Sequence, residues 1–161
     1  MRKLNPSHVT ALIDLINHGP FIEHLSMVIK ELGVGYCFLE VDVEEKHHNP
    51  FGGIHGGVYA SVIDTAAYWA AYCELEEDAG MVSLELKVNN VAAIKSGKIL
   101  VKGKSIKVGR TVALVEAIVT NLDGKILAQG TSTLMLTPGR QTISDALNLI
   151  GAKSLPSKFL V

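Results

Sequence analysis

The chain has 161 residues, of which 48% are hydrophobic and 19% charged, and its formal net charge is −1 at pH 7. This length and composition are typical of one globular domain and exclude a largely disordered chain. A net charge so close to zero gives no overall field that would attract nucleic acid or an acidic membrane. An anionic ligand therefore has to be met by a local group of basic residues.

The two cysteines, Cys37 and Cys73, match neither a metal-ligand nor a redox spacing, and both stand among apolar residues, as buried free thiols do. The sequence contains no segment resembling a signal peptide and no apolar run that reads as a membrane span. We therefore expect a cytoplasmic protein with no nucleic-acid or membrane partner.

Residues 1–35 are predicted to form two helices that pack on the main domain. Apolar residues recur at helical spacing over residues 7–18, with Ser7 as the candidate N-cap, and again over residues 21–32. Gly33 is the expected end of the second helix. The histidines of this region are expected at solvated positions without a function: His8, His18 and His24.

A strand, a loop and one long helix are predicted for residues 36–72. Aromatic and β-branched residues alternate with acidic ones over residues 36–43, which is typical of a strand. After the loop, an apolar segment begins at Gly56 or Gly57 and continues to Tyr72. Because a helix that is apolar on all sides is a buried helix, this segment is predicted to form the centre of the fold.

Asp64 is the only acid in this predicted helix. Aspartate is a poor residue for a helix interior, and burying its charge without a partner is costly. We therefore expect function, and not stability, to keep Asp64 there. The alternative is an acid that only satisfies neighbouring hydroxyl groups, and Ser61 and Tyr68 lie one helical turn away on the same face.

Four runs with strand character follow, at about residues 82–91, 98–108, 111–121 and 125–137, joined by short glycine-containing turns. No helix intervenes, so the class is α+β and the sheet is predicted to curl around the helix. Residues 145–150 are predicted to form a short helix before an apolar tail. We predict one domain overall, with N-terminal helices over 1–35, a core over 36–138 and a C-terminal extension over 139–161.

The central segment resembles a known family. The resemblance rests on the turn His55-Gly56-Gly57, Asp64 eight residues after the first glycine, Asn49 fifteen residues before Asp64, and Ser83 at the start of the next strand. With the strand order, this pattern resembles the hotdog fold and in particular the PaaI-type (phenylacetic-acid-pathway-like) acyl-CoA thioesterases. It implies a long central helix wrapped by a curved antiparallel sheet of five or six strands. It also implies hydrolysis of acyl-CoA or aryl-CoA thioesters to free acid and coenzyme A, without a separate cofactor.

Attack on a thioester turns its carbonyl oxygen into an oxyanion, which needs fixed hydrogen-bond donors. The backbone N–H groups of Gly56 and Gly57 at the helix N-terminus are the expected oxyanion hole, unless these glycines form only a tight turn. By resemblance, Asp64 of one subunit faces the glycine turn of another, which makes a homodimer the minimum and allows a homotetramer. Asp64 would act as general base or as nucleophile, and the sequence does not separate these routes. The other expected catalytic residues orient the water or thioester or polarise its carbonyl: Asn49, Ser83 and His55.

The phosphates of coenzyme A are expected to bind one local basic patch drawn from Lys95, Lys98, Lys102, Lys104, Lys107 and Arg110. The hairpin at 107–111 resembles the nucleotide-contacting turn of the family. The expected substrate and coenzyme A contacts are Ser61, Tyr68, Lys95, Lys107, Arg110 and Thr111. The alternative is that these lysines only keep strand edges solvated. His47, His48 and His55 share one loop without the spacing of a tetrahedral ligand set, so we expect no metal site.

Two other functions stay open from the sequence. A hotdog hydratase or dehydratase would use His48 and Asp64, although the Pro-rich turn of that branch is missing here. A non-catalytic acyl-CoA sensor would keep the pocket without hydrolysis. The first 35 residues show no helix-turn-helix with a basic face, which weighs against a DNA-binding regulator.

Overall fold

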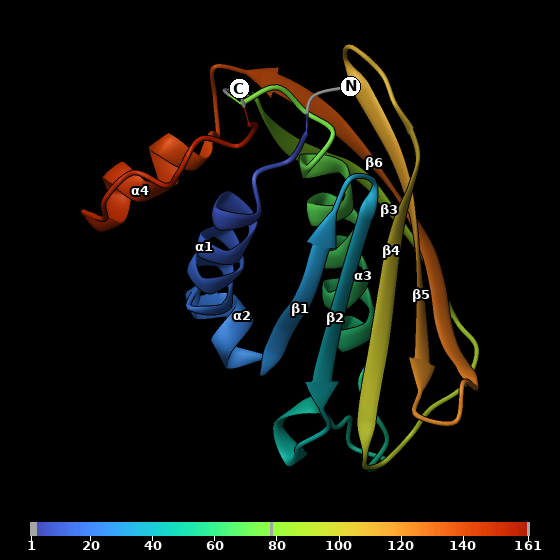
Figure 1. The fold of residues 1–161 in the computed structure, drawn as a ribbon. Coiled ribbons are helices and arrows are strands. Elements are labelled where there is room, and N and C mark those ends of the chain that lie inside the picture. Colours follow the sequence, from blue (N-terminus) through green and yellow to red (C-terminus); the bar gives the residue numbers. More distant parts are fainter. Residues whose placement is uncertain (1–2, 78, 161) are drawn as a thin grey trace.

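The computed structural model describes residues 3–77 and 79–160 and has a six-stranded antiparallel sheet that curves around one central helix (Figure 1). The strands lie in the order β1-β2-β4-β5-β6-β3. Their bounds are β1 Met27–Gly33, β2 Tyr36–Asp42, β3 Ala79–Asn90, β4 Lys98–Val108, β5 Val112–Asn121 and β6 Ile126–Pro138. The predicted α+β hotdog fold is therefore confirmed, with six strands.

The central helix, α3 (Gly56–Tyr72), has the predicted bounds and lies on the concave face of the sheet. Its side toward the sheet is fully buried and rich in alanine, which lets the helix approach the strands closely. On β4, a Cβ atom added to Gly103 would lie 2.4 Å from the carbonyl oxygen of Ala66. Glycine at this position is therefore required by the approach of the helix backbone to the strand.

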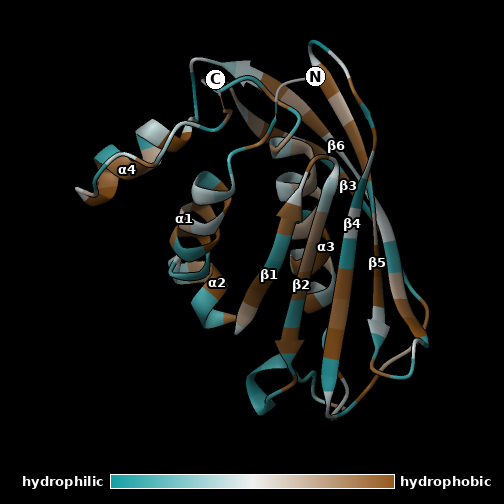
Figure 2. Cartoon of the chain, viewed as in Figure 1, coloured by the Kyte–Doolittle hydropathy of each residue, from teal (hydrophilic) through white to brown (hydrophobic). Residues whose placement is uncertain are grey.

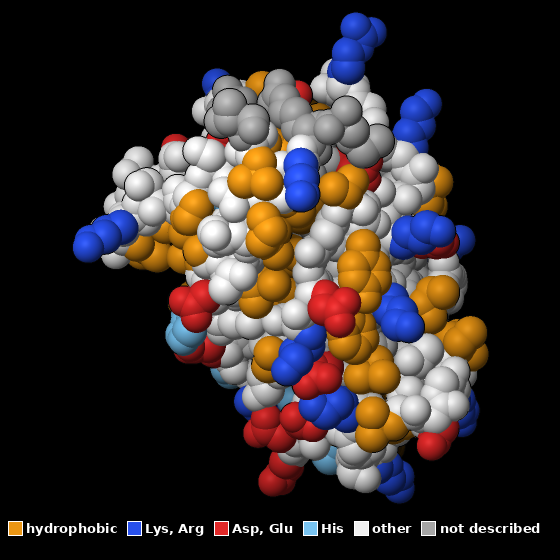
Figure 3. All heavy atoms as spheres, in the orientation of Figure 1, with side chains coloured by type: hydrophobic (Ala, Val, Ile, Leu, Met, Phe, Trp, Pro, Cys, Tyr) orange, Lys and Arg blue, Asp and Glu red, His pale blue; other side chains and the backbone are white. Residues whose placement is uncertain are grey.

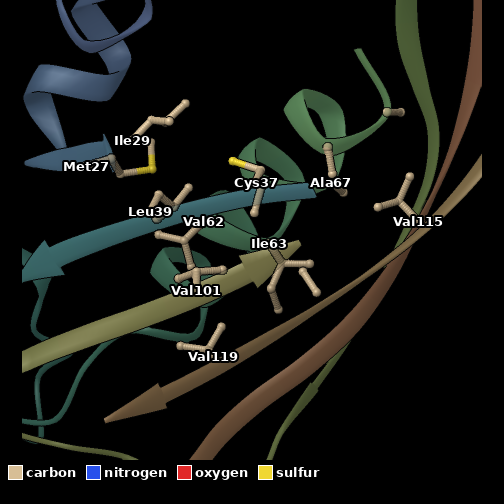
Figure 4. Packing of buried hydrophobic residues seen from close by; sticks show 14 of the residues in the cluster. Met27, Ile29, Cys37, Leu39, Val62, Ile63, Ala67, Val101, Val115 and Val119 are labelled. Carbon is tan, nitrogen blue, oxygen red and sulfur yellow. The ribbon is translucent and has the colours of Figure 1, made fainter. Parts of the chain in front are cut away.

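Buried side chains from all six strands pack against those of α3 to form the core (Figure 4). Figure 2 shows hydrophobic residues along both the strands and α3. Figure 4 shows Val62, Ile63 and Ala67 of the helix among strand residues that alternate in burial as a half-covered sheet requires. On the outer face, basic and acidic side chains are interspersed (Figure 3). Within the described part of the chain, no helix has the length and hydropathy needed to cross a membrane.

The predicted second helix over residues 21–32 is wrong. The helix α2 (Pro20–His24) is short, Ser26 adopts a left-handed conformation with φ 50°, and strand β1 follows. Met27 and Ile29 are buried, while Val28 and Lys30 are exposed. The apolar residues of this short stretch are therefore compatible with the period of a strand as well as with that of a helix. Pairing with β2 decides between them, because tertiary contacts override local propensity.

The first helix, α1 (Pro6–Asn17), is close to its prediction, but Asn5 and not Ser7 is the N-cap. The side-chain oxygen of Asn5 accepts a hydrogen bond from Ser7 N at 3.0 Å, and Pro6 takes the first helical position. At its other end, the Asn17 side chain bonds both backbone groups of Ile29, at 2.8 and 3.0 Å. These bonds fix α1 against β1.

The C-terminal extension contains α4 (Ile143–Ile150) and a tail that packs across the end of α3. Lys158 of this tail is fully buried, and its Nζ donates to the backbone oxygens of Tyr72 at 2.6 Å and Leu75 at 2.8 Å. The ammonium group thus caps the C-terminal end of the helix, where the dipole favours a cation. The tail also covers His8, which is buried and bonded to Pro156 O, so the expectation that His8 is solvated is wrong.

Candidate active site

Asp64 is half-buried on α3 and hydrogen-bonded to a neighbouring strand. Ser83, near the start of β3, donates its hydroxyl to Asp64 Oδ1 at 2.8 Å. Within residues 3–77 and 79–160, no other donor reaches this carboxylate, so Oδ2 is open. A carboxylate that is held by one oxygen and open at the other can accept a proton or attack a substrate.

In the described part of the chain, neither of the two hydroxyl residues predicted to flank Asp64 is hydrogen-bonded to its carboxylate. Ser61 donates back to Gly57 O at 2.9 Å, which is a local bond within the helix and not a bond to Asp64. Tyr68 lies next to Asp64 along the helix and packs edge-on against Trp69, with ring centroids 5.0 Å apart. Burial raises the pKa of Tyr68, so its hydroxyl is neutral at physiological pH.

Asp64 opens onto an apolar groove of about 430 Å³ that we call the acid groove. Its other lining residues come from α1, α2, α3, α4 and the segment between α1 and α2: Leu15, Ile16, His18, Gly19, Pro20, Ile22, Thr65, Tyr68, Trp69, Ile143, Ala146 and Ile150. Apolar walls with a few polar groups are typical of small-molecule sites, which span about 300–1,000 Å³. The contribution of α4 was not predicted, because that helix is remote from Asp64 along the chain.

The N-terminus of α3 carries the glycine turn. His55 is the N-cap, and its Nδ1 accepts a hydrogen bond from Gly57 N at 2.8 Å. The Gly57 N–H is therefore occupied within the subunit, whereas no described residue accepts from the Gly56 N–H. Since Nδ1 is an acceptor, the proton of a neutral His55 ring lies on Nε2, where it is available to a ligand.

A second cavity, of about 360 Å³, lies beside this turn, and we call it the glycine cavity. It is lined by Asn49, Ile54, Gly56, Tyr59, Asn90, Val91, Ala92 and Ala93. Asn49 Oδ1 accepts from the backbone N–H groups of Phe51 at 2.9 Å and Gly53 at 3.3 Å, so this side chain shapes the loop. Asn90 was not predicted from the sequence, because only pairing of β3 with β6 places it beside the turn.

The acid and the glycine turn are separated along the helix. Gly56 and Asp64 are eight residues apart, which at ~1.5 Å per residue is roughly 12 Å. They also line different cavities, the glycine cavity and the acid groove. One thioester carbonyl cannot contact both groups of the same subunit at hydrogen-bond distance.

The basic residues do not form the single patch that was predicted. Lys95 and Arg110 lie beyond opposite ends of β4, and the strand between them spans roughly 33 Å at about 3.3 Å per residue. Lys98 is paired with Glu40 at 2.7 Å, and Figure 3 shows basic and acidic side chains interspersed. The Arg110 end includes the exposed residues Lys107 and Thr111 at the β4–β5 hairpin. Lys107, Arg110 and Thr111 are therefore separated from Lys95, and these expected coenzyme A contacts do not share one site within the subunit.

The histidines of the loop before α3 are structural in this subunit. His47 is fully buried, with Nδ1 accepting from Glu44 N at 2.9 Å and Nε2 bonded to Leu25 O at 2.9 Å. His48 Nε2 is 2.7 Å from Lys95 O. Across the described residues, no three His, Cys, Asp or Glu side chains are grouped so that they could hold a metal ion. His48 lines a cavity with His55, whereas Asp64 lines the acid groove, so a His48–Asp64 pair does not form within one subunit.

A curved antiparallel sheet wrapped around a long central helix, with a glycine turn at the start of that helix, is the arrangement of the hotdog fold. The family model of the thioesterase superfamily matches residues 51–128. The chain is 34% identical over 101 residues to human acyl-coenzyme A thioesterase 13, covering 62% of this chain and 71% of that protein. The chain therefore belongs to the thioesterase superfamily.

Further relatives and solved structures agree with this assignment. A 1,4-dihydroxy-2-naphthoyl-CoA hydrolase of Listeria monocytogenes is 27% identical over 119 residues, covering 74% of this chain and 97% of that protein. A thioesterase from Haemophilus influenzae superposes with a TM-score of 0.78 over 88% of this chain and 98% of its own, at 22% identity, which shows the fold alone. Zebrafish thioesterase superfamily member 2 has a TM-score of 0.72 at 29% identity, covering 80% of this chain and 98% of its own.

Proposed function

We propose that the protein hydrolyses acyl-CoA thioesters at a site made by two subunits. The observation that carries this proposal is the separation, by roughly 12 Å of helix, of an open carboxylate at Asp64 from an open backbone donor at Gly56. Thioester hydrolysis needs both groups at one carbonyl. A second copy in which the helices lie side by side would supply the missing half to each site.

The edge of the sheet supports such an assembly. Strand β3 lies at the edge of the sheet, next to β6, and is 12 residues long. Ser83 is exposed on this strand and Leu84 is 58% exposed, while the outward strip of α3 around Asp64 is only half-buried. A long edge strand with apolar side chains favours pairing with another chain.

In the proposed reaction, the partner's Gly56 N–H binds the thioester carbonyl oxygen and stabilises the negative charge that forms on it. His55 Nε2–H of the same turn is a second candidate donor, and Asn49 in the adjoining glycine cavity would orient the water or the thioester. Asp64, oriented by Ser83, takes a proton from the attacking water, and the coenzyme A thiolate leaves when the carbonyl re-forms. The route through an acyl anhydride on Asp64 uses the same geometry.

For the coenzyme A phosphates we propose the hairpin group Lys107, Arg110 and Thr111. Arginine at an exposed turn can bind phosphate in a bidentate manner. Ser61 and Lys95 remain candidate substrate contacts near the glycine turn. Ser61 lines the same cavity as His55 and His48, and His48 Nε2 is bonded to Lys95 O. The buried free thiols of Cys37 and Cys73 fit a reducing compartment, so a cytoplasmic location is part of the proposal.

Thiol release from a panel of short, medium, long and aryl acyl-CoAs, followed with a thiol reagent, tests the proposal. Asp64→Asn keeps the shape of the side chain and removes its basicity, and we expect kcat to fall by ~10²-fold or more. Asp14→Asn is the matched control, because the Asp14 side chain is 78% exposed on α1. Activity that survives Asp64→Asn would exclude Asp64 as the base or nucleophile. Absence of thiol release from every substrate would favour a hydratase or a sensor.

A further inference from the structure

The far wall of the acid groove is built by a helix outside the family-matched residues. The match ends at residue 128, whereas Ile143, Ala146 and Ile150 of α4 line the groove opposite Tyr68 and Trp69 of α3. These three residues follow helical spacing, i, i+3 and i+7, and therefore share one face of α4. Leu149 lies off this face and is 87% exposed.

Both ends of this wall are anchored to the body of the protein. Before α4, the turn at 139–141 packs on β3 so closely that a Cβ atom on Gly80 would lie 2.1 Å from the Gln141 oxygen. After α4, the tail is held by the buried Lys158 ammonium on the Tyr72 and Leu75 carbonyls. The Thr142 and Asp145 capping box begins the helix. The chain on either side of α4 is thus anchored to β3 and to the end of α3.

The chemistry of the lining selects an apolar occupant that reaches Asp64. Side chains of Leu15, Ile16, Ile22 and the α4 residues supply apolar walls. The lining side chains that carry polar or ionisable groups are Asp64, Thr65, His18, Tyr68 and Trp69. An anionic or strongly polar group would lose its hydration there without gaining partners. A hydrocarbon chain attached to a carbonyl at Asp64 would instead bury apolar surface along the groove.

We propose that the acid groove holds the acyl chain, and that the α4 face of Ile143, Ala146 and Ile150 sets the longest chain that is accepted. This inference rests on the proposed thioesterase function and names its substrate class as acyl-CoAs with aliphatic chains. We assign chain-length specificity to Ala146 because it lines the groove with a small side chain, so a larger side chain there would fill part of the groove.

The test compares Ala146→Phe with Leu149→Phe in the full-length protein. Both place a phenyl ring on α4, but of the two positions only Ala146 lines the groove, whereas Leu149 is 87% exposed. With acetyl-, butanoyl-, octanoyl- and dodecanoyl-CoA, we expect Ala146→Phe to lower kcat/KM for the two longer substrates by tenfold or more. The two shorter substrates should change by less than twofold. Leu149→Phe should leave the whole profile unchanged.

A binding measurement makes this test independent of turnover. Trp69 is the only tryptophan of the sequence and lines the groove, so its fluorescence reports on an occupant. Decan-1-ol is an uncharged probe that Asp64 does not repel. It should shift the emission of the unmodified protein and of Leu149→Phe, with affinity reduced fivefold or more in Ala146→Phe.

The outcomes separate the two proposals. If the protein hydrolyses acyl-CoAs but Ala146→Phe keeps the chain-length profile, the assignment of α4 is overturned and the thioesterase proposal stands. If no acyl-CoA is cleaved, the thioesterase proposal fails, and the decan-1-ol titration still decides whether the groove binds an apolar chain. No response of Trp69 to decan-1-ol would overturn the groove assignment.

Discussion

The Gly56 N–H is the most specific element of the proposed site, and replacement by proline removes that one hydrogen atom. Gly56 is the first residue of α3, where proline is well tolerated because its N–H has no partner within the helix. The preceding residue, His55, has φ −71° and ψ 137°, the extended conformation that a following proline requires. Gly56→Pro should therefore fold.

The expected magnitude follows from the role of the donor. Loss of one oxyanion donor typically lowers kcat by ~10²–10³, or about 2.7–4 kcal/mol of transition-state stabilisation. Any added Cβ atom would lie 2.7 Å from the Asn90 Nδ2 atom, which is a side-chain end that can move. Gly56→Ala adds the same Cβ atom but keeps the N–H, so it is the matched control and should lose far less activity.

The assay is thiol release at saturating acyl-CoA, with circular dichroism to establish that both variants are folded. Gly56→Pro should show the large loss in kcat with little change in KM, because the donor acts mainly on the transition state. A kcat for Gly56→Pro within threefold of that for Gly56→Ala would refute the role of this N–H as an oxyanion donor.

Two further predictions concern stability. Gly103→Ala should lower the free energy of unfolding by about 1–3 kcal/mol, because its Cβ atom would meet the Ala66 backbone. Gly33→Ala is the control and should be nearly neutral, because Gly33 has open space around it. Denaturant titration measures both, and equal stabilities of the two variants would contradict the close approach of the helix to β4. Burial lowers the pKa of Lys158 from its ordinary 10.5 to about 8. Between these pH values the unfolded chain holds a proton that the folded chain has released, so stability rises with pH. Relative to Lys158→Met, the unmodified protein should gain roughly 3 kcal/mol from pH 7 to pH 11, and a pH-independent difference would contradict this.

Local sequence patterns were sufficient for the elements around the site. The apolar run after the glycine turn predicted the bounds of α3, and the strand character of residues 98–108 between glycine-containing turns predicted β4 as it is observed. Asp64 and Gly56 could be selected because each is unusual in its own segment. An acid in an apolar helix and paired glycines at a helix start are visible without any long-range contact.

What was missed depends on contacts between distant residues. Strand β1 was predicted as helix because Met27, Ile29 and their neighbours fit both periods over so short a stretch, and pairing with β2 makes the choice. The engagement of the Gly57 N–H by His55 is a cap geometry that the residue types alone do not specify. The position of α4 depends on residues 139–141 and Lys158, which pack on Gly80 of β3 and Tyr72 of α3, far away in the sequence.

The central claim, that each site combines groups of two subunits, is tested most directly by mixing two inactive variants. Asp64→Asn and Gly56→Pro chains are refolded together, and tags of different kinds establish that mixed dimers form. When equal amounts of the two chains pair at random, about half of the dimers are mixed. In each mixed dimer one of the two sites has both its carboxylate and its N–H donor intact. The mixture should therefore have about a quarter of the activity of the unmodified protein. Mixed dimers with no more activity than either parent would contradict a site shared between subunits.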